Sequence, residues 1–475
     1  MLEAVFCLPL FAGLIAFLLP VKLGRGVLVV GALLHLQLTL LAWLSDFPPL
    51  LPGYFSTAPA GILVLLVTSF IFVFIAPYSI FYMREQEMQS EPIFIGSMLL
   101  FLGTMSMAAL AEHPIVFWIA IEATTLVSAP LIFVNRSKKA LEATWKYVLI
   151  CSVGIALALL GFFFITLSMD RAGIDVPLTF SSLNTAAKHL DPLWLKIGFI
   201  FVIIGFGTKM GLAPMHTWLP DAHSEAPSPA SALLSGALLN CAFLGIFKVH
   251  TLMVLAGLGD FSGSLLIGFG LFSILVAGIF ILKQPDYKRM LAYSSIENMG
   301  VIAFGVGIGG MALYGAMLHL IHHSLLKSSL FLSAGNLLLG FGSKIVAQCG
   351  GMTRLLPRTF VSFFAGFLGI SGLPPFGVFV SELLILIGAF KAGHPVAGGL
   401  FIASLALVVA GFARIVTSMS FGPSRQEILV PEQTLRIVSP FALLLTSAVL
   451  CVWMPEPLHQ IIINTITVIG GTIHG

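Results

Sequence analysis

The sequence has few charged residues. Asp, Glu, Lys and Arg make up 9% of the 475 residues, whereas apolar residues make up 58%. A soluble domain carries roughly a quarter of charged residues, because much of its surface stays in water after folding. The scarcity of charge therefore excludes a soluble globular protein. We expect an integral membrane protein built of α-helices, which tolerates the 47 glycines and 26 prolines among its apolar runs.

Sequence features that mark several other classes of protein are missing. The five cysteines stand apart, without a C-x-x-C pair for zinc or an iron–sulfur cluster. There is no G-x-x-x-x-G-K-[ST] loop for nucleotide phosphates, and the dispersed basic residues form no stripe for nucleic acid. We expect no metal, cofactor, nucleotide or nucleic acid in this chain. Glu3, rather than Lys or Arg, precedes the first apolar run, which argues against a cleaved signal peptide.

The apolar runs predict how often the chain crosses the membrane. A span needs about 20 mostly apolar residues, and about fourteen segments qualify, with 457–472 as a possible further piece. The fourteen are 2–20, 26–45, 61–83, 93–112, 114–134, 146–169, 194–214, 229–250, 264–282, 290–308, 311–340, 359–391, 396–420 and 437–455.

The basic residues predict the orientation of these spans. With the N-terminus outside, sixteen of the 23 Lys and Arg fall in inner loops, as the positive-inside rule requires. These are Lys22, Arg25, Arg84, Arg136, Lys138, Lys139, Lys146, Lys283, Lys288, Arg289, Lys344, Arg354, Arg358, Arg414, Arg425 and Arg436. We expect a multi-pass protein of a prokaryotic cytoplasmic (inner) membrane with an external N-terminus.

Two spans contain the same kind of interruption, 161 residues apart. One break holds Gly211 and Pro214, and the other holds Gly372, Pro374 and Pro375. Paired Gly/Pro breaks are typical of inverted-repeat transporters, although proline kinks are also common in single membrane helices. We predict N-terminal helices over 1–92, a first five-helix repeat over 93–250, an inverted second repeat over 264–420, and one or more C-terminal helices over 421–475.

Ionisable residues within the spans indicate the function, because charge in the bilayer is costly. Glu122 and Lys209, in neighbouring spans, can form either a pair that switches with protonation or a static ion pair. His319, His323 and Lys327 recur every four residues, so they share one helical face that could relay protons. Zinc is the weaker alternative, since no further Cys, Asp or Glu stands nearby.

Further residues extend the predicted path. Glu382 follows the second break and is the candidate terminal proton donor or acceptor, whereas His322 points away from the His319 face. His216 and His223 stand in a polar segment that we expect to be an inner loop. The remaining possible relays are Asn240, Lys248, which could instead snorkel, and Glu297.

This set of residues resembles the antiporter-like subunits of respiratory complex I, Mrp-type Na⁺/H⁺ antiporters and membrane-bound [NiFe] hydrogenases. The most specific stretches are KMGLAPMHTWLPDAHSEAPSPASALLSGALLN at 209–240 and HLIHHSLLKSSLFLSAGN at 319–336. The resemblance implies a fourteen-helix fold with two inverted repeats. It also implies proton-translocating roles for Glu122, Lys209, the His319–Lys327 face and Glu382. Asn240 departs from the Lys of many complex I members and, with Glu297, is more similar to hydrogenase-4 component F.

The resemblance implies a non-redox subunit that works with other membrane subunits and a peripheral redox arm. Proton translocation in such a complex is the leading interpretation. A gradient-driven Na⁺/H⁺ antiporter subunit is the first alternative, although the sequence shows no clear cluster of oxygen ligands for Na⁺. The second alternative is a membrane partner that energises an inorganic-carbon uptake enzyme.

Overall fold

The chain folds into a bundle of long helices. In this computed structural model we describe residues 2–45, 48–88, 90–423 and 428–469, which form helices, connecting segments and two isolated β-bridges. Twelve of the described helices are long and apolar enough to cross a membrane, and Ala4–Ala16 and Pro357–Ile370 are shorter apolar helices. The protein is therefore an all-α, multi-pass membrane protein.

The helices follow the predicted spans closely. They are α1 (Ala4–Ala16), α2 (Val21–Leu44), α3 (Pro59–Glu85), α4 (Glu91–Leu110), α5 (Pro114–Phe133), α6 (Lys138–Arg171), α7 (Phe180–Ala186), α8 (Pro192–Met210), α9 (Trp218–Glu225), α10 (Ser228–Leu233), α11 (Leu239–Leu255), α12 (Gly259–Ile281), α13 (Tyr287–Ile308), α14 (Gly310–Phe341), α15 (Met352–Leu355), α16 (Pro357–Ile370), α17 (Gly377–Lys391), α18 (Pro395–Phe421), α19 (Thr434–Val452) and α20 (Glu456–Thr467). Each of the fourteen predicted segments overlaps one of these helices or a broken pair of them.

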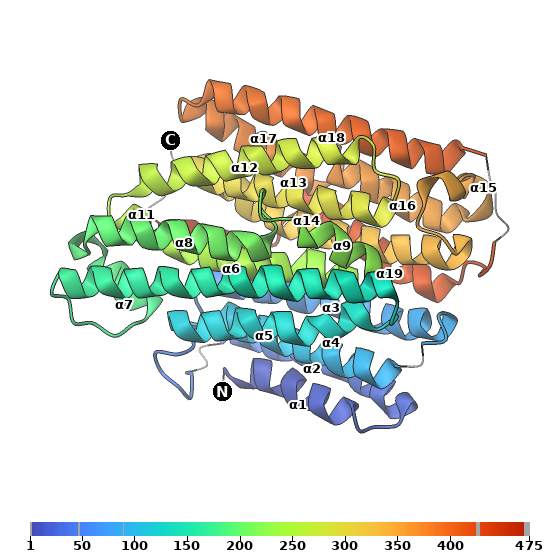
Figure 1. The fold of residues 1–475 in the computed structure, drawn as a ribbon, viewed down its shortest axis with the longest axis horizontal. Helices are drawn as coiled ribbons and strands as arrows, with labels where there is room; N and C mark the ends of the chain where they lie inside the picture. The colour runs from blue at the N-terminus through green and yellow to red at the C-terminus, as the bar shows by residue number, and fades with distance from the viewer. Residues whose placement is uncertain (1, 46–47, 89, 424–427, 470–475) are drawn as a thin grey trace.

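The helices run roughly parallel to one another, so the bundle has two ends (Figure 1). The start of α1 and the short helix α7 lie at one end, called here the α7 end. The short helices α9 and α15 lie at the other, called the α9 end. Arg25 and Glu91, at the starts of α2 and α4, form an ion pair of 2.7 Å.

Both predicted breaks are present. Helix α8 ends at Met210, and the next residue, Gly211, has a φ of 87°, the left-handed conformation that glycine adopts without strain. After a short non-helical segment the chain continues in α9. The second break separates α16 from α17, and Gly372 there has a φ of 69°. Ala213–Pro214 and Pro374–Pro375 are both cis peptide bonds.

Two details of the sequence analysis were wrong. The segment after the first break is not a polar loop, because Trp218–Glu225 forms α9 and most of its side chains are buried. Most of the basic residues predicted in inner loops do not lie in loops either, because the helices extend further than the apolar runs. Twelve of the sixteen lie within helices: Lys22, Arg25, Arg84, Lys138, Lys139, Lys146, Lys288, Arg289, Arg354, Arg358, Arg414 and Arg436. Arg425 and the end of the possible last apolar piece, 470–472, lie outside the described residues.

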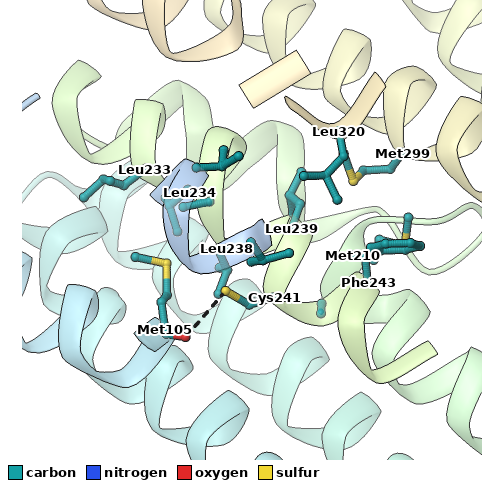
Figure 2. Packing of buried hydrophobic residues seen from close by; sticks show 14 of the residues in the cluster. Met105, Met210, Leu233, Leu234, Leu238, Leu239, Cys241, Phe243, Met299 and Leu320 are labelled. Carbon is teal, nitrogen blue, oxygen red and sulfur yellow. Dashed lines mark hydrogen bonds between the residues drawn. The ribbon is translucent and has the colours of Figure 1, made fainter. Parts of the chain in front are cut away.

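An irregular turn joins α10 to α11 at the centre of the bundle. Residues Leu234–Leu238 form a π-helix, and the whole of Ser228–Leu255 packs inside the protein. Figure 2 shows the buried side chains around this turn, with the Cys241 Sγ 3.9 Å from the carbonyl oxygen of Met105. A π-helical turn shifts the register of the helix and is frequent at functional sites.

Candidate proton-translocation site

Lys209 lies fully buried at the end of α8, two residues before the left-handed turn at Gly211. Its Nζ donates hydrogen bonds of 2.7 Å to Thr125 Oγ1 on α5 and of 2.7 Å to the Tyr147 hydroxyl on α6. The ammonium also lies 4.6 Å from the centre of the Tyr147 ring. A buried ammonium is therefore held by hydroxyl groups and an aromatic face.

Glu122 is not in direct contact with Lys209. Its Oε1 accepts a 2.6 Å hydrogen bond from Ser152 Oγ on α6, and its buried Oε2 has no hydrogen-bond partner. The ion pairs within 4.0 Å among the described residues join other side chains. Of the two roles that the sequence left open, a static contact ion pair does not fit this geometry.

Hydroxyl groups surround the space between these two charges. The Tyr147 hydroxyl bonds Lys209 and lies 2.7 Å from Ser128 Oγ. Thr125 and Ser128 follow Glu122 at intervals of three residues, so they share its face of α5. Hydroxyls both donate and accept hydrogen bonds, so they can pass a proton between the charged groups. These hydroxyls were not among the predicted site residues, although the spacing of Thr125 and Ser128 after Glu122 was a usable signal.

Asn240 connects the first half of the bundle to the centre. Its amide nitrogen donates a 2.7 Å bond to Ser324 Oγ on α14, the neighbour of His323 in the sequence, while its buried carbonyl oxygen has no partner. Ser235 in the π-helical turn pairs with Ser295 on α13 at 2.7 Å. Polar contacts therefore continue where a lysine was expected from the resemblance.

The predicted histidine face lies on α14 and is completely buried. The rings of His319 and His323 are nearly parallel, with centres 6.5 Å apart. His319 lies between Ser381 at 2.9 Å and Asn298 at 3.0 Å, whereas neither ring nitrogen of His323 has a hydrogen-bond partner. Lys327 Nζ donates a 2.9 Å bond to the carbonyl oxygen of Leu291. The ring nitrogens of His323 are therefore buried polar atoms that no described protein group satisfies.

Glu297 and Glu382 extend the buried polar groups toward the second break. Glu297 accepts a bond from the amide of Asn298, the residue that also contacts His319. Glu382 on α17 lies against the break itself, since a Cβ at Gly372 would come within 2.2 Å of its carboxylate. His322, by contrast, is 3.0 Å from Ser447 on α19, and its ring packs against Gly377 at the start of α17.

The remaining predicted relays lie toward the two ends. His216 and His223, on the α9 side of the first break, have buried ring nitrogens without partners, and His223 stacks on Phe331 at 4.9 Å. Lys248 lies near the α7 end of α11 and is only 8% exposed, so it does not snorkel. The described residues contain no group of three or more His, Cys, Asp or Glu side chains that could hold a metal ion.

Comparison with known proteins shows the family. Residues 111–406 match the family described as NADH:quinone oxidoreductase/Mrp antiporter, transmembrane. The chain is 39% identical over 325 residues to the hydrogenase-4 component F homolog of Methylacidiphilum infernorum. This alignment covers 68% of each of the two chains. The chain therefore belongs to this family of antiporter-like membrane subunits, which includes subunits of hydrogenase and complex I-type complexes.

Two further similarities agree with this assignment. Hydrogenase-4 component B of Escherichia coli is 32% identical over 332 residues, an alignment that covers 67% of this chain and 48% of that protein. This chain thus matches about half the length of component B. In fold, the chain is similar to a subunit of the archaeal membrane-bound sulfane sulfur reductase, with a TM-score of 0.88, 21% identity, and coverage of 99% of this chain and 98% of that one.

Proposed function

We propose that this chain translocates protons as a membrane subunit of an energy-converting hydrogenase-type complex. The observation that carries the proposal is the set of buried and half-buried ionisable groups that extends from Glu122 and Lys209 to the His319–Lys327 face and Glu382. The series crosses both broken helices and lies inside an otherwise apolar bundle. Buried ionisable groups in membrane proteins mark ion pathways and proton relays.

In the proposed mechanism, protonation of one ionisable group changes how readily the neighbouring ionisable group releases its proton. A proton that neutralises Glu122 removes the negative charge that stabilises ammonium at Lys209. Lys209 then releases its proton more readily, and the hydroxyls of Thr125 and Tyr147 are its hydrogen-bonded neighbours. Asn240 and Ser324 link this half to the central histidines, and Glu382 completes the series. The two predicted repeats, 93–250 and 264–420, would thus act as coupled units.

Other subunits must supply the energy. This chain has no nucleotide-binding loop and no cysteine pair for a redox centre, so we propose that it carries no redox cofactor and acts through a peripheral redox arm. Glu122 and Glu382 are both half-buried beside exposed apolar residues such as Leu126 on α5 and Leu383 on α17. We place neighbouring membrane subunits against these two flanks.

We further propose that the chain lies in a prokaryotic cytoplasmic membrane with the α7 end outside. Support comes from basic residues at the α9 end, since Lys146 and Arg289 form ion pairs with Asp221 and Lys344 forms one with Glu225, both acidic residues of α9. The positive-inside rule would then place this end inside. A cysteine at Asp175, in the segment before α7, should react with a membrane-impermeant maleimide in intact cells. Reaction only after the membrane has been opened would reverse the orientation.

The assembly and the transport function can be tested together. Affinity purification of the tagged chain from its own membranes should recover hydrogenase-like redox subunits. Glu122→Gln should reduce proton uptake by vesicles that contain this complex at least tenfold, because an amide cannot accept the proton, while the complex still assembles. Recovery without redox subunits, together with Na⁺-dependent proton transport, would favour the antiporter subunit instead. Unchanged uptake in the variant would contradict the proton path.

A further inference from the structure

A cavity of about 170 Å³ lies at the α7 end of the first half of the bundle. Helices α3, α7, α11 and α20 and the segment between α4 and α5 contribute its lining, which includes Glu112, Asn184, Lys248 and Thr251. The Oδ1 atom of Asn184 is buried without a hydrogen-bond partner, which leaves an acceptor for water. The proton path described above does not include this cavity.

Lys248 is held in the wall of this cavity without a contact carboxylate. Its Nζ donates a short hydrogen bond of 2.5 Å to the carbonyl oxygen of Ala111 and lies 4.5 Å from the centre of the Phe180 ring. Glu112 lines the same cavity, but its two oxygens accept bonds from the Ser181 amide and the Ser56 hydroxyl. The lysine is thus close to a carboxylate without forming an ion pair.

Four phenylalanines separate Lys248 from Lys209. Phe117, Phe162, Phe180 and Phe206, called here the phenylalanine cluster, form a closed set of ring contacts with centres 5.2 to 6.3 Å apart. Phe206 precedes Lys209 by about one turn of α8, and the Lys248 ammonium lies over Phe180 and, at 5.8 Å, over Phe117.

The packing closes this cluster against α11. A Cβ at Gly245 would come within 2.7 Å of both the Phe117 and the Phe206 rings, so only glycine allows the rings to approach so closely. Apolar constrictions of this kind exclude water and can act as gates in channels. In this conformation the cluster therefore blocks a water path between the cavity and Lys209.

We propose that Lys248 is the outer proton-release residue of the first repeat and that the phenylalanine cluster is its gate. The inference rests on the proposed proton function. When the cluster opens, water connects the two lysines, and the proton that leaves the Lys209 ammonium binds the neutral amine of Lys248. After the cluster closes, the Lys248 ammonium releases that proton into the cavity. This assignment gives the first repeat an exit two turns beyond Asn240 on the same helix.

The competing interpretation is that Lys248 only stabilises the fold. A lysine that donates to the carbonyl of Ala111 caps the end of α4, and such contacts stabilise helix termini. This role requires a hydrogen-bond donor but no water-accessible, titrating amine. The two interpretations therefore differ in whether position 248 is accessible to water. They also differ in which chemical group restores proton transport when Lys248 has been replaced.

The first experiment measures accessibility and does not depend on transport. In full-length protein carrying Cys7→Ser and Cys451→Ser within its assembled complex, Lys248→Cys should react with an impermeant trimethylammonium-ethyl methanethiosulfonate added from the α7 side. Leu244→Cys, one turn deeper and fully buried, should react at least tenfold more slowly. Equal rates at both positions, or reaction of Lys248→Cys only from the α9 side, would overturn the proposed cavity and gate.

The second experiment measures proton uptake by vesicles during electron flow through the assembled complex. Lys248→Met should reduce uptake at least tenfold, whereas Lys196→Met should not, because Lys196 lies over the Phe261 ring away from the cavity. Aminoethyl methanethiosulfonate, which adds an ammonium to Lys248→Cys, should restore uptake, and the sulfonatoethyl reagent should not.

The outcomes separate this inference from the proposed function. Uptake by Lys248→Met at the wild-type rate, or equal restoration by a neutral methyl reagent, would overturn the role of Lys248 and leave the proton function standing. Failure of the wild-type complex to take up protons would overturn the proposed function instead. The accessibility experiment would still decide whether the cavity and the gate exist.

Discussion

At the scale of single residues, hydroxyl groups rather than a direct ion pair contact the two ionisable groups Glu122 and Lys209. Glu122 contacts Ser152, and Lys209 contacts Thr125 and Tyr147, so the two ionisable groups interact through space and through hydroxyls. A direct ion pair would trap both groups in the charged state. Separation leaves each group able to exchange a proton, which is what a relay requires.

Tyr147 offers a test of this arrangement. Tyr147→Phe removes one of the two hydrogen bonds to the ammonium of Lys209, a change that costs about 1.5 to 3 kcal/mol for a charged group. We expect the complex to assemble and proton uptake to fall about tenfold. Tyr314→Phe is the matched control, because the Tyr314 hydroxyl forms its hydrogen bond with His459, which does not belong to the proposed path. Uptake that stays at the wild-type rate in Tyr147→Phe would remove the hydroxyl from the mechanism.

The charged members of the site were predictable from the sequence, but their contacts were not. Glu122, Lys209 and His319 stand out because charge is rare in apolar spans. Serine and threonine are common in such spans, so Ser152 and Ser324 gave no signal of their own. The burial of Lys248 was also hidden, because only the fold brings Phe180 from α7 over its ammonium.

At the scale of helices, glycines determine how closely the spans pack. Gly263 and Gly270 on α12 lie against Gly307 and Gly300 on α13, each pair spaced by seven residues. Small residues at such spacing let membrane helices approach to backbone contact. The breaks were predictable from their Gly and Pro residues. The π-helical turn at Leu234–Leu238 was not, because its residues fit an ordinary helix and tertiary packing decides its geometry.

Two glycines on the same helix provide a controlled test of this packing. A Cβ at Gly270 would come within 2.7 Å of the Gly300 carbonyl oxygen, whereas a Cβ at Gly268 would meet open space. Gly270→Ala should therefore cost about 1 to 3 kcal/mol through overpacking and lower the thermal unfolding temperature in detergent. Gly268→Ala should leave that temperature unchanged. Equal unfolding temperatures for the two variants would contradict the close α12–α13 contact.

At the scale of the whole molecule, the bundle combines two broken helices with one buried polar series. The backbone amide of Ala213, in the first break, donates a 2.9 Å bond to Ser273 on α12, so the first break directly contacts the second half of the chain. A change at Lys209 can therefore reach the second half both through Asn240 and through the break. The span count and its Gly/Pro breaks already indicated this architecture, whereas the contact between the halves required the structure.

Proton uptake in a Lys209→Met variant tests the central claim most directly. Inside-out vesicles that contain the assembled complex would be supplied with an electron donor that the complex oxidises, and a pH-sensitive dye would follow uptake while dihydrogen release reports electron flow. We predict that Lys209→Met lowers proton uptake at least tenfold per dihydrogen released, while Lys196→Met keeps the wild-type ratio. A wild-type ratio in Lys209→Met would contradict proton translocation through this site.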